Sequence, residues 1–201
     1  MPVERLLAEL RRHVSDERVL DAIRAVPRDR FVPAAAIGEA WANIPLPIGA
    51  GQTISQPLVV ARMCALLELR GSERVLDVGT GSGWHAGVLA RLAAHVWSIE
   101  VHAQLSHAAA ARLAACGIDN VELVVGDGAL GLPAQAPFHA INVAAAAGDG
   151  IPRPLIDQLA RGGRLVAPVG GDDQRLVLVR RDAGGAVTAT ALERVRFVPL
   201  I

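Results

Sequence analysis

The chain of 201 residues contains no lysine, no tyrosine and only two cysteines. Without lysine there is no Schiff-base nucleophile, no pyridoxal phosphate linkage and no phosphate-binding loop of the type that ends in lysine. Without tyrosine, no phenol serves as acid or base. Cys64 and Cys116 lie far apart, which excludes a disulfide framework and argues against a cysteine metal cluster. So few cysteines are typical of a reducing compartment, and we expect a cytoplasmic protein.

Neither sign of charge is in excess, because 20 arginines balance 20 acidic residues. This balance argues against nucleic-acid binding, which depends on basic side chains that displace counterions. Hydrophobic residues make up 52% of the chain, so a packed core is expected rather than disorder. No run of about 18 uncharged apolar residues occurs, so no membrane span is expected, and the early charges argue against a signal peptide. The six histidines lack metal-ligand spacing, so we assign no metal.

Helical and strand-like patterns alternate regularly from residue 58 to the end of the chain. The expected helices are 58–69, 84–92, 102–115 and 152–159, and the expected strands are 74–78, 96–100, 121–125, 138–143 and 164–169. This alternation predicts an α/β fold with a doubly wound, mostly parallel sheet. Apolar runs at 174–181 and 187–195 flank Ala183-Gly184-Gly185, which predicts a closing antiparallel hairpin.

The first 57 residues follow a different pattern. Residues 3–25 are expected to be helical, with Ser15 as an N-cap and Pro27 ending the run. The stretch from Pro27 to Pro57 has many prolines and no strong periodicity, so an irregular segment is expected. Long segments of this kind often serve as lids over a site, and a pinned N-terminal arm is the alternative. We therefore expect one domain over 1–201, in which residues 1–57 cover the cleft of an α/β core at 58–201.

A glycine-rich turn, Asp77-Val78-Gly79-Thr80-Gly81-Ser82-Gly83, follows the first predicted strand of that core. Ligands in such sheets bind beyond the carboxyl ends of the strands. The G-x-G-x-G spacing differs from the G-x-G-x-x-G of dinucleotide-binding proteins. Asp77 would repel a pyrophosphate but attract a cation. S-adenosyl-L-methionine, which has an ammonium and a sulfonium but no phosphate, satisfies both conditions.

Two further acids end the next two predicted strands. Glu100 lies 17 residues after Gly83, where its carboxylate can accept hydrogen bonds from both ribose hydroxyls. Asp127 and Gly128 follow the third strand, where a carboxylate can accept from an adenine amino group. Because the ends of parallel strands meet at one edge of the sheet, the three acids predict one cofactor site. A cap or turn role is the alternative for each acid alone.

These motifs and their flanks resemble the class I S-adenosylmethionine-dependent methyltransferases and, among them, the protein-L-isoaspartate O-methyltransferases. The resemblance runs from about Val26 to the C-terminus. It is carried by PLPIGAGQTISQP (45–57), LDVGTGSGWHAGVLA (76–90), VGDGALGLP (125–133), LARGGRLVAPVG (159–170) and RVRFVPLI (194–201). GQTISQP is specific to the isoaspartate family, whereas the glycine motif alone indicates only the superfamily.

The resemblance implies an enzyme that methylates the α-carboxylate of L-isoaspartyl residues in damaged proteins or peptides and so starts their repair. Ser55 matches the serine that lies beside the reacting carboxylate, and Thr53, Ile54 and Gln56 match residues that line the cofactor and substrate cleft. The other expected cofactor contacts are Asp77, Gly79, Thr80, Gly81, Ser82, Gly83, Glu100, Asp127 and Gly128. A carboxylate acceptor is already ionised at pH 7, so Ser55 needs only to orient it. A local turn hydrogen bond is the alternative for Ser55.

Other interpretations of the sequence remain open. The stretch from Ala144 to Gly150 departs from the family pattern, which keeps a related methyltransferase of another carboxylate, such as an aspartate of a peptide natural product, as an alternative. An NAD-dependent oxidoreductase is disfavoured by the glycine spacing, and a non-catalytic cofactor-binding module by GQTISQP. We expect His85 to cap or pack, and we expect Trp84 in the core or the cleft wall, where it can pack against the cofactor. A monomer without nucleic-acid or membrane partners is expected.

Overall fold

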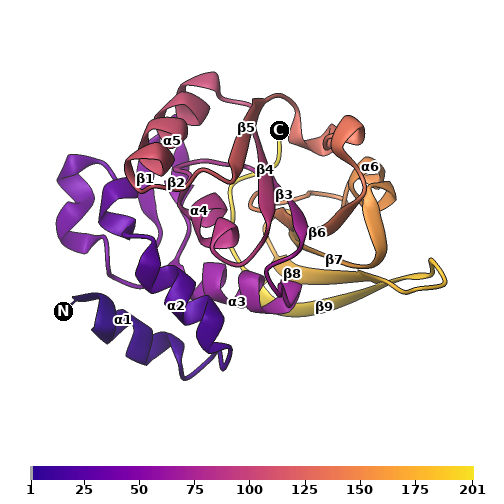
Figure 1. The fold of residues 1–201 in the computed structure, drawn as a ribbon, viewed down its shortest axis with the longest axis horizontal. Helices are drawn as coiled ribbons and strands as arrows, with labels where there is room; N and C mark the ends of the chain where they lie inside the picture. Colours follow the sequence, from indigo (N-terminus) through magenta and orange to yellow (C-terminus); the bar gives the residue numbers. More distant parts are fainter. Residues whose placement is uncertain (1) are drawn as a thin grey trace.

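The computed structural model describes residues 2–201 and is built around a seven-stranded sheet in the order β5-β4-β3-β6-β7-β8-β9 (Figure 1). Its strands are β3 (Arg74–Val78), β4 (His95–Glu100), β5 (Val121–Val125), β6 (Phe138–Val143), β7 (Leu159–Val169), β8 (Gln174–Arg181) and β9 (Val187–Val195). Strands β3 to β7 pair in parallel, whereas β8 and β9 are antiparallel. The predicted fold class is therefore confirmed.

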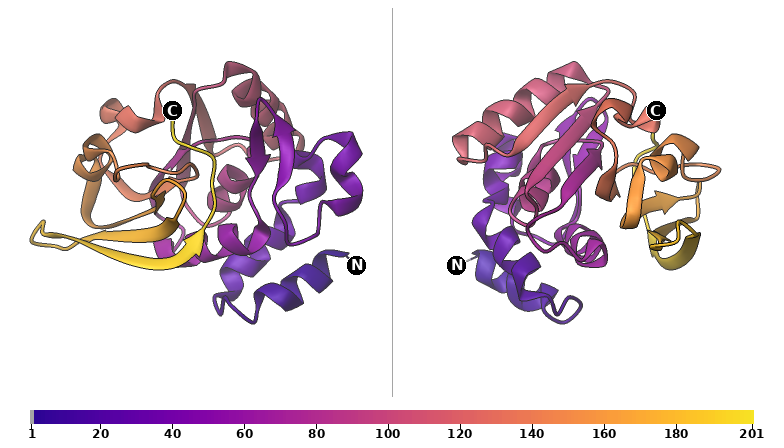
Figure 2. Two further views of the ribbon diagram at one scale, coloured as in Figure 1. Left: turned by 180° about the vertical axis from the view of Figure 1, so that it is seen from behind. Right: turned by 45° about the vertical axis from the view of Figure 1, so that its right-hand side comes forward.

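Helices cover both faces of this sheet, but unequally. The helices of the α/β core are α3 (Pro57–Leu67), α4 (Trp84–Ala90), α5 (Ala103–Ala115) and α6 (Arg153–Asp157). Successive strand residues alternate between two apolar clusters, as the two-residue period of a strand requires. Val75 packs in the cluster that contains α3, α4 and α5, and Leu76 packs in the cluster that contains α6. Figures 1 and 2 show α6 on the opposite side of the sheet from α4 and α5.

The N-terminal helices α1 (Pro2–Leu10) and α2 (Glu17–Ala25) belong to the larger of these clusters. Each has a buried apolar stripe with helical spacing, such as Leu6, Leu7 and Leu10 of α1. Both helices contact α3, and α2 also contacts α4. The segment 2–25 therefore packs against the helices on one side of the core. The residues that approach the strand ends come later in the chain.

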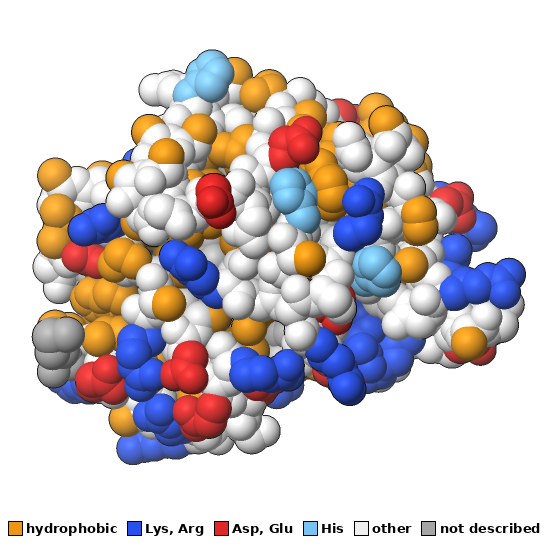
Figure 3. Space-filling view, viewed as in Figure 1, with side chains coloured by type: hydrophobic (Ala, Val, Ile, Leu, Met, Phe, Trp, Pro, Cys, Tyr) orange, Lys and Arg blue, Asp and Glu red, His pale blue; other side chains and the backbone are white. Residues whose placement is uncertain are grey.

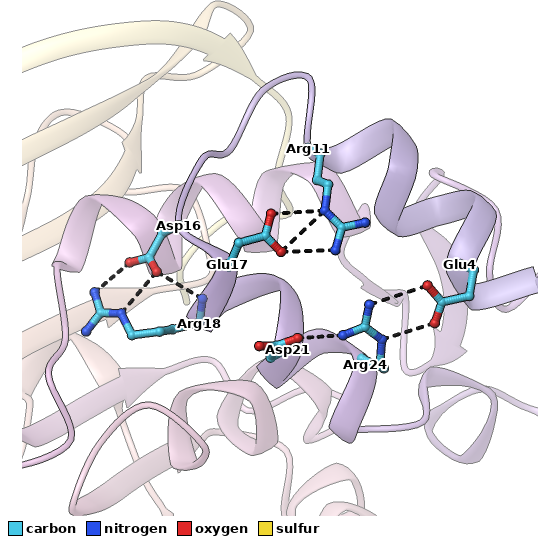
Figure 4. A network of polar contacts seen from close by, with 7 residues as sticks. All are labelled: Glu4, Arg11, Asp16, Glu17, Arg18, Asp21 and Arg24. Atoms are coloured by element: carbon cyan, nitrogen blue, oxygen red, sulfur yellow. Dashed lines mark hydrogen bonds and ion pairs between the residues drawn. The ribbon is translucent and has the colours of Figure 1, made fainter.

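The start of α2 differs by one residue from the prediction. Asp16, not Ser15, is the N-cap, because its carboxylate accepts the Arg18 backbone N–H at 3.0 Å. Ion pairs link α1 and the turn after it to α2 (Figure 4): Arg11 pairs with Glu17 at the start of α2, and Glu4 pairs with Arg24 in its last turn. Figure 3 shows acidic and basic side chains interspersed over this part of the surface. Exposed pairs of this kind contribute little to stability, so the apolar stripes hold the helices.

The stretch from Pro27 to Pro57 is more ordered than its sequence suggests. Besides two 3₁₀ turns, it forms a hairpin of β1 (Leu46–Gly49) and β2 (Gln52–Ile54). The expectation of an irregular segment is wrong here, because Ala50 adopts a φ of 51° that closes a tight turn. Buried Leu46 and Ile54 then anchor the two strands in the core. This hairpin, rather than α1 or α2, is the part of residues 2–57 that reaches the strand ends.

Two smaller differences concern the second half of the sheet. β7 begins at Leu159 instead of 164, because a bulge at the glycines near 162 lets the strand pair earlier with Phe138 of β6. The preceding helix α6 is correspondingly shorter than predicted. Within residues 2–201 no helix is long and apolar enough to cross a membrane.

Candidate active site

A cleft opens at the carboxyl ends of β3, β4 and β6. The empty space between its walls, including the part open to solvent, is about 530 Å³. This edge is where the strand order reverses, with β4 on one side of β3 and β6 on the other, and such points bind ligands in α/β sheets. The described walls are formed by Gln52, Thr53, Val78, Gly79, Gly81, Ile99, Glu100, Val101, His102, Gly128, Ala144, Ala145 and residues 198–201.

The glycine-rich turn forms the floor of the cleft and leads into α4. Gly79, Gly81 and Gly83 all have positive φ angles, of 92°, 53° and 89°. Gly83 illustrates why a larger residue does not fit: a Cβ there would lie 2.9 Å from the Cβ of Ala109 in α5. The turn therefore exposes backbone, rather than side chains, to a ligand. Of the predicted cofactor residues, Gly79 and Gly81 line the cleft, and Thr80 and Ser82 line a narrower space behind it.

Glu100 joins the end of β4 to this turn. One carboxylate oxygen accepts the Gly81 N–H at 2.8 Å, and the other accepts the His102 N–H at 3.0 Å. The side chain is 6% exposed and lines the cleft. Each oxygen retains acceptor capacity, so the carboxylate can bind two neighbouring hydroxyl groups of a ligand.

Asp77 lies behind the cleft wall and is completely buried. Its carboxylate accepts hydrogen bonds of 2.7 Å from the Ser98 hydroxyl and from the Asn142 amide. Burial raises the pKa of Asp77 to about 6, and the charge of Glu100 acts in the same direction, although both hydrogen bonds oppose them. Its hydrogen-bond donors are neutral, and no ion pair to Asp77 forms within residues 2–201. The structure therefore places a poorly compensated negative charge behind the glycine turn.

His85 continues this buried polar network, and it neither caps α4 nor reaches the cleft wall beside Glu100. Its Nδ1 lies 3.3 Å from the Asn142 amide nitrogen, and its Nε2 lies 3.5 Å from the sulfur of Cys64. Burial lowers the pKa of His85 to about 3, so the ring is neutral at pH 7. Burial, together with the charge of Asp77, raises the pKa of the Cys64 thiol. Neither group can act as a base or nucleophile near pH 7.

The third predicted acid has a different environment. Asp127 is exposed, and its carboxylate accepts the Ala129 N–H at 2.8 Å, so it caps the short turn Gly128–Leu130. Gly128 is buried and lines the cleft, where a Cβ would lie 2.5 Å from a methyl group of Val78. The structure thus brings Gly128 to the cleft and leaves the Asp127 side chain on the surface, in a cap role.

The segment 53–56 separates the cleft from a groove on its other side. Thr53, Ile54 and Ser55 face the glycine turn across the narrow space behind the cleft. Thr53, Ser55 and Gln56 also line a groove of about 840 Å³, together with residues 194–198. Ala144 lines both spaces. Thr53 therefore lines the cleft, the narrow space and the groove, and Ser55 stands between the narrow space and a groove that can admit a second reactant.

Comparison with known proteins identifies this arrangement. The family model described as Protein-L-isoaspartate(D-aspartate) O-methyltransferase matches residues 1–201. The chain belongs to this family. The Protein-L-isoaspartate O-methyltransferase 2 of Archaeoglobus fulgidus is 49% identical over 98% of this chain and 91% of its own length. The Protein-L-isoaspartate O-methyltransferase of Anaeromyxobacter dehalogenans is 52% identical over 98% of this chain and 97% of its own.

Solved structures of the isoaspartate methyltransferases share the fold. One protein-L-isoaspartate O-methyltransferase superposes with a TM-score of 0.88 at 27% identity; the match covers 98% of this chain but only 65% of that longer one. A putative family member from Plasmodium falciparum, solved with S-adenosyl-L-homocysteine, has a TM-score of 0.83 at 25% identity, over 98% of this chain and 96% of that one. The fold is that of a class I methyltransferase, and S-adenosylmethionine is the cofactor of the family.

The structure of this methyltransferase also shows residues that sequence reasoning missed. Arg28 is completely buried, and its guanidinium donates to the carbonyls of Ala40, Ala42, Ile44 and Ser55. It thereby holds the backbone of Ser55. Burial lowers the pKa of Arg28 to about 10, which leaves it charged at pH 7. No spacing in the sequence distinguishes Arg28 from the other nineteen arginines.

Trp84 and Asn142 are buried behind the site, which the sequence indicates only in part. Trp84 is fully buried, donates its indole N–H to the Val26 carbonyl at 3.0 Å, and packs below Arg28. Asn142 is a buried polar residue in β6, whose other buried residues are apolar, and this contrast is the signal that the sequence offers for it. Both residues support the walls of the site from behind.

Proposed function

We propose that this chain transfers a methyl group from S-adenosylmethionine to the α-carboxylate of L-isoaspartyl residues in proteins or peptides, the step that starts their repair to aspartate. The observation that carries this proposal is the position of Ser55 between the narrow space behind the cleft and the groove beside it. The curated relatives described above carry the name of this activity. We further propose a cytoplasmic monomer without nucleic-acid partners; sedimentation of the purified chain would test the monomeric state.

The residues of the cleft fit S-adenosylmethionine better than a dinucleotide. Asp77 and Glu100 are buried acids, and their hydrogen bonds come only from backbone N–H groups and neutral side chains. Such a pair favours a cationic ligand and opposes a pyrophosphate. Glu100 would hold the ribose hydroxyls, the turn at Gly79 and Gly81 would lie against the ligand, and Asp77 would attract its ammonium group. When bound, the cofactor supplies an electrophilic methyl group.

This chain contributes alignment rather than acid–base chemistry. The acceptor carboxylate is ionised at pH 7 and needs no base. His85 is held in the buried network, and burial lowers its pKa to about 3, so its neutral ring is too weak a base for this role. The Ser55 hydroxyl, fixed through its backbone by Arg28, would donate to the carboxylate and orient one oxygen toward the methyl group. Gln52 and Thr53 of the β1–β2 hairpin and residues 198–201 line the cleft and would shield a bound cofactor from water.

The reaction is tested with two peptides that differ only in one linkage. Radiolabelled S-adenosylmethionine is incubated with the protein and either an isoaspartyl peptide or its aspartyl counterpart. We expect base-labile methyl ester on the isoaspartyl peptide alone. Labelling of the aspartyl peptide instead would favour the alternative methyltransferase of another carboxylate. The absence of label on both peptides would contradict the proposal.

Replacing Glu100 with alanine should weaken cofactor binding about tenfold or more. The carboxylate would lose charge-assisted hydrogen bonds to the ribose, each worth roughly 1.5–3 kcal/mol, and about 1.4 kcal/mol corresponds to a tenfold change in affinity. Isothermal calorimetry with S-adenosylhomocysteine measures the effect. Because Glu100 also accepts the Gly81 and His102 N–H groups, Glu100→Gln, which keeps one carbonyl acceptor, should lose less than Glu100→Ala.

Two controls accompany the Glu100 measurement. The wild-type protein should not bind NAD under the same conditions, since its pyrophosphate would face two acids. Circular dichroism of Glu100→Ala should show an intact fold, so that weaker binding reflects the site. An unchanged affinity would mean that Glu100 only fastens the glycine turn and does not contact the ribose.

A further inference from the structure

The groove beside Ser55 extends well past the reacting position. The first part is lined by Ser55 and Arg196, and a second hollow of about 1030 Å³ continues to Arg12, just after the end of α1. Both parts are lined by Gln56, Val59, Arg194 and Val195, so they form one continuous depression. We call it the α3–β9 groove. Figure 2 (left) shows the end of β9 beside α3, below the β1–β2 hairpin.

The walls of the α3–β9 groove are strongly basic although the whole chain is neutral. Its charged lining consists of four arginines and one glutamate, namely Arg12, Arg62, Arg194, Arg196 and Glu193. Arg62 pairs with Glu193 at 2.8 Å, and Arg194 pairs with Asp173 at 3.1 Å. Arg12 and Arg196 are exposed and form no ion pair with any residue from Pro2 to Ile201. Their charges are available to a ligand.

The floor of the groove and its edge suit a polypeptide. Apolar side chains of Leu58, Val59, Leu176 and Val195 line the second part. β9 is the last strand of the sheet, and no other strand within residues 2–201 pairs with its outer edge. Extended peptides commonly bind along such an edge, with backbone hydrogen bonds and side-chain pockets. A polynucleotide would gain little from an apolar floor, so a peptide is the better occupant.

We propose that the α3–β9 groove binds the residues that flank the isoaspartyl residue and selects flanking segments rich in aspartate and glutamate. This inference rests on the proposed function, because the groove begins at Ser55, where the acceptor carboxylate would lie. The substrate chain runs along α3 and β9 toward Arg12, and its acidic side chains meet Arg196 and Arg12. The enzyme thus distinguishes damaged sites by the charge of their surroundings.

The test uses matched isoaspartyl peptides that differ only in flanking charge. Three residues on one side of the isoaspartate are glutamate, glutamine or lysine, and a second set varies the other side. In one of the two sets, we expect the KM of the glutamate peptide to be about threefold to tenfold below the KM of the glutamine peptide. The difference is modest because each exposed ion pair contributes little. Raising the salt concentration from about 50 to about 500 mM should narrow the difference, since salt screens exposed charges.

A double variant tests whether the arginines of the α3–β9 groove cause the preference for glutamate-flanked peptides. In Arg12→Gln/Arg196→Gln, the ratio of the glutamine-peptide KM to the glutamate-peptide KM should fall to about one. Arg5→Gln is the matched control, since Arg5 is an exposed arginine of α1 outside the groove, and there the ratio should stay at its wild-type value. Equal KM values for the three peptides, with methylation intact, would overturn the inference and leave the proposed function standing.

A binding measurement separates the two proposals if no peptide is methylated. The fluorescence anisotropy of a labelled glutamate-flanked peptide is titrated with protein in the presence of S-adenosylhomocysteine. Tighter binding than the glutamine-flanked peptide, lost in the double variant, would support the groove even if the proposed function failed. Equal binding of both peptides, or displacement of the acidic peptide by a short single-stranded RNA at equal concentration, would overturn the inference.

Discussion

Replacing Arg28 with alanine should lower the free energy of unfolding by roughly 3–5 kcal/mol, a large effect for one substitution. The guanidinium donates to four backbone carbonyls of the segment 40–55. Its removal leaves buried acceptors without donors, and water entering the cavity would satisfy only part of them. The packing of Arg28 on Trp84, 5.2 Å from the ring centre, would be lost as well.

Arg30→Ala is a suitable control for the Arg28 experiment. Arg30 lies two residues away, is exposed, and donates to a single carbonyl, that of Ala115, at 3.1 Å. For a chain of this size about 1 kcal/mol corresponds to roughly 2–4 °C, so calorimetry should show Arg28→Ala melting about 6–20 °C below the wild type. Arg30→Ala should melt within about 2 °C of it. Similar melting temperatures for the two variants would show that the carbonyl cluster does not stabilise the fold.

The α/β core could be predicted because its strands are short apolar runs between clear turn signals. β3, β5, β6, β8 and β9 have the predicted bounds. The β1–β2 hairpin could not be predicted in the same way, because its strands have only four and three residues and Pro47 interrupts the first strand. The hairpin is stabilised by the burial of Leu46 and Ile54 in a core whose other residues are distant in sequence. Tertiary packing, and not a local pattern, forms these strands.

The acids of the predicted site show what spacing along the chain can and cannot indicate. Each lies near or just beyond the carboxyl end of a strand, as predicted, but of the three only Glu100 lines the cleft. The face to which a side chain points follows from its place in its own strand, but its neighbours depend on the order and register of the adjacent strands, which the sequence does not show directly. Asp77 is opposite Ser98 in β4 and Asn142 in β6, so the pairing itself assembles the buried network. The roles of all these residues toward the cofactor stay predictions.

Ser55→Ala should slow methyl transfer by about 10- to 100-fold while cofactor affinity changes much less. The hydroxyl would donate one hydrogen bond to a charged carboxylate, worth roughly 1.5–3 kcal/mol if it is fully expressed in the transition state. Ser55 lies on the groove side of the hairpin end, and Arg28 holds its backbone independently of its side chain. The substitution therefore removes the hydroxyl without releasing the segment. Ser55→Thr, which retains a hydroxyl, should recover part of the rate.

The pH dependence of the same reaction distinguishes orientation from base catalysis. Single-turnover rates on an isoaspartyl peptide, with saturating cofactor, should stay flat from about pH 6 to about pH 9 in both the wild-type enzyme and the Ser55→Ala variant, because the acceptor is ionised throughout. Cofactor affinity should weaken below about pH 6, since the pKa of Asp77 is raised to about 6 and protonation removes its negative charge. A rate that rises steeply above pH 7 would require a base, and a wild-type rate in Ser55→Ala would make Ser55 a turn residue only.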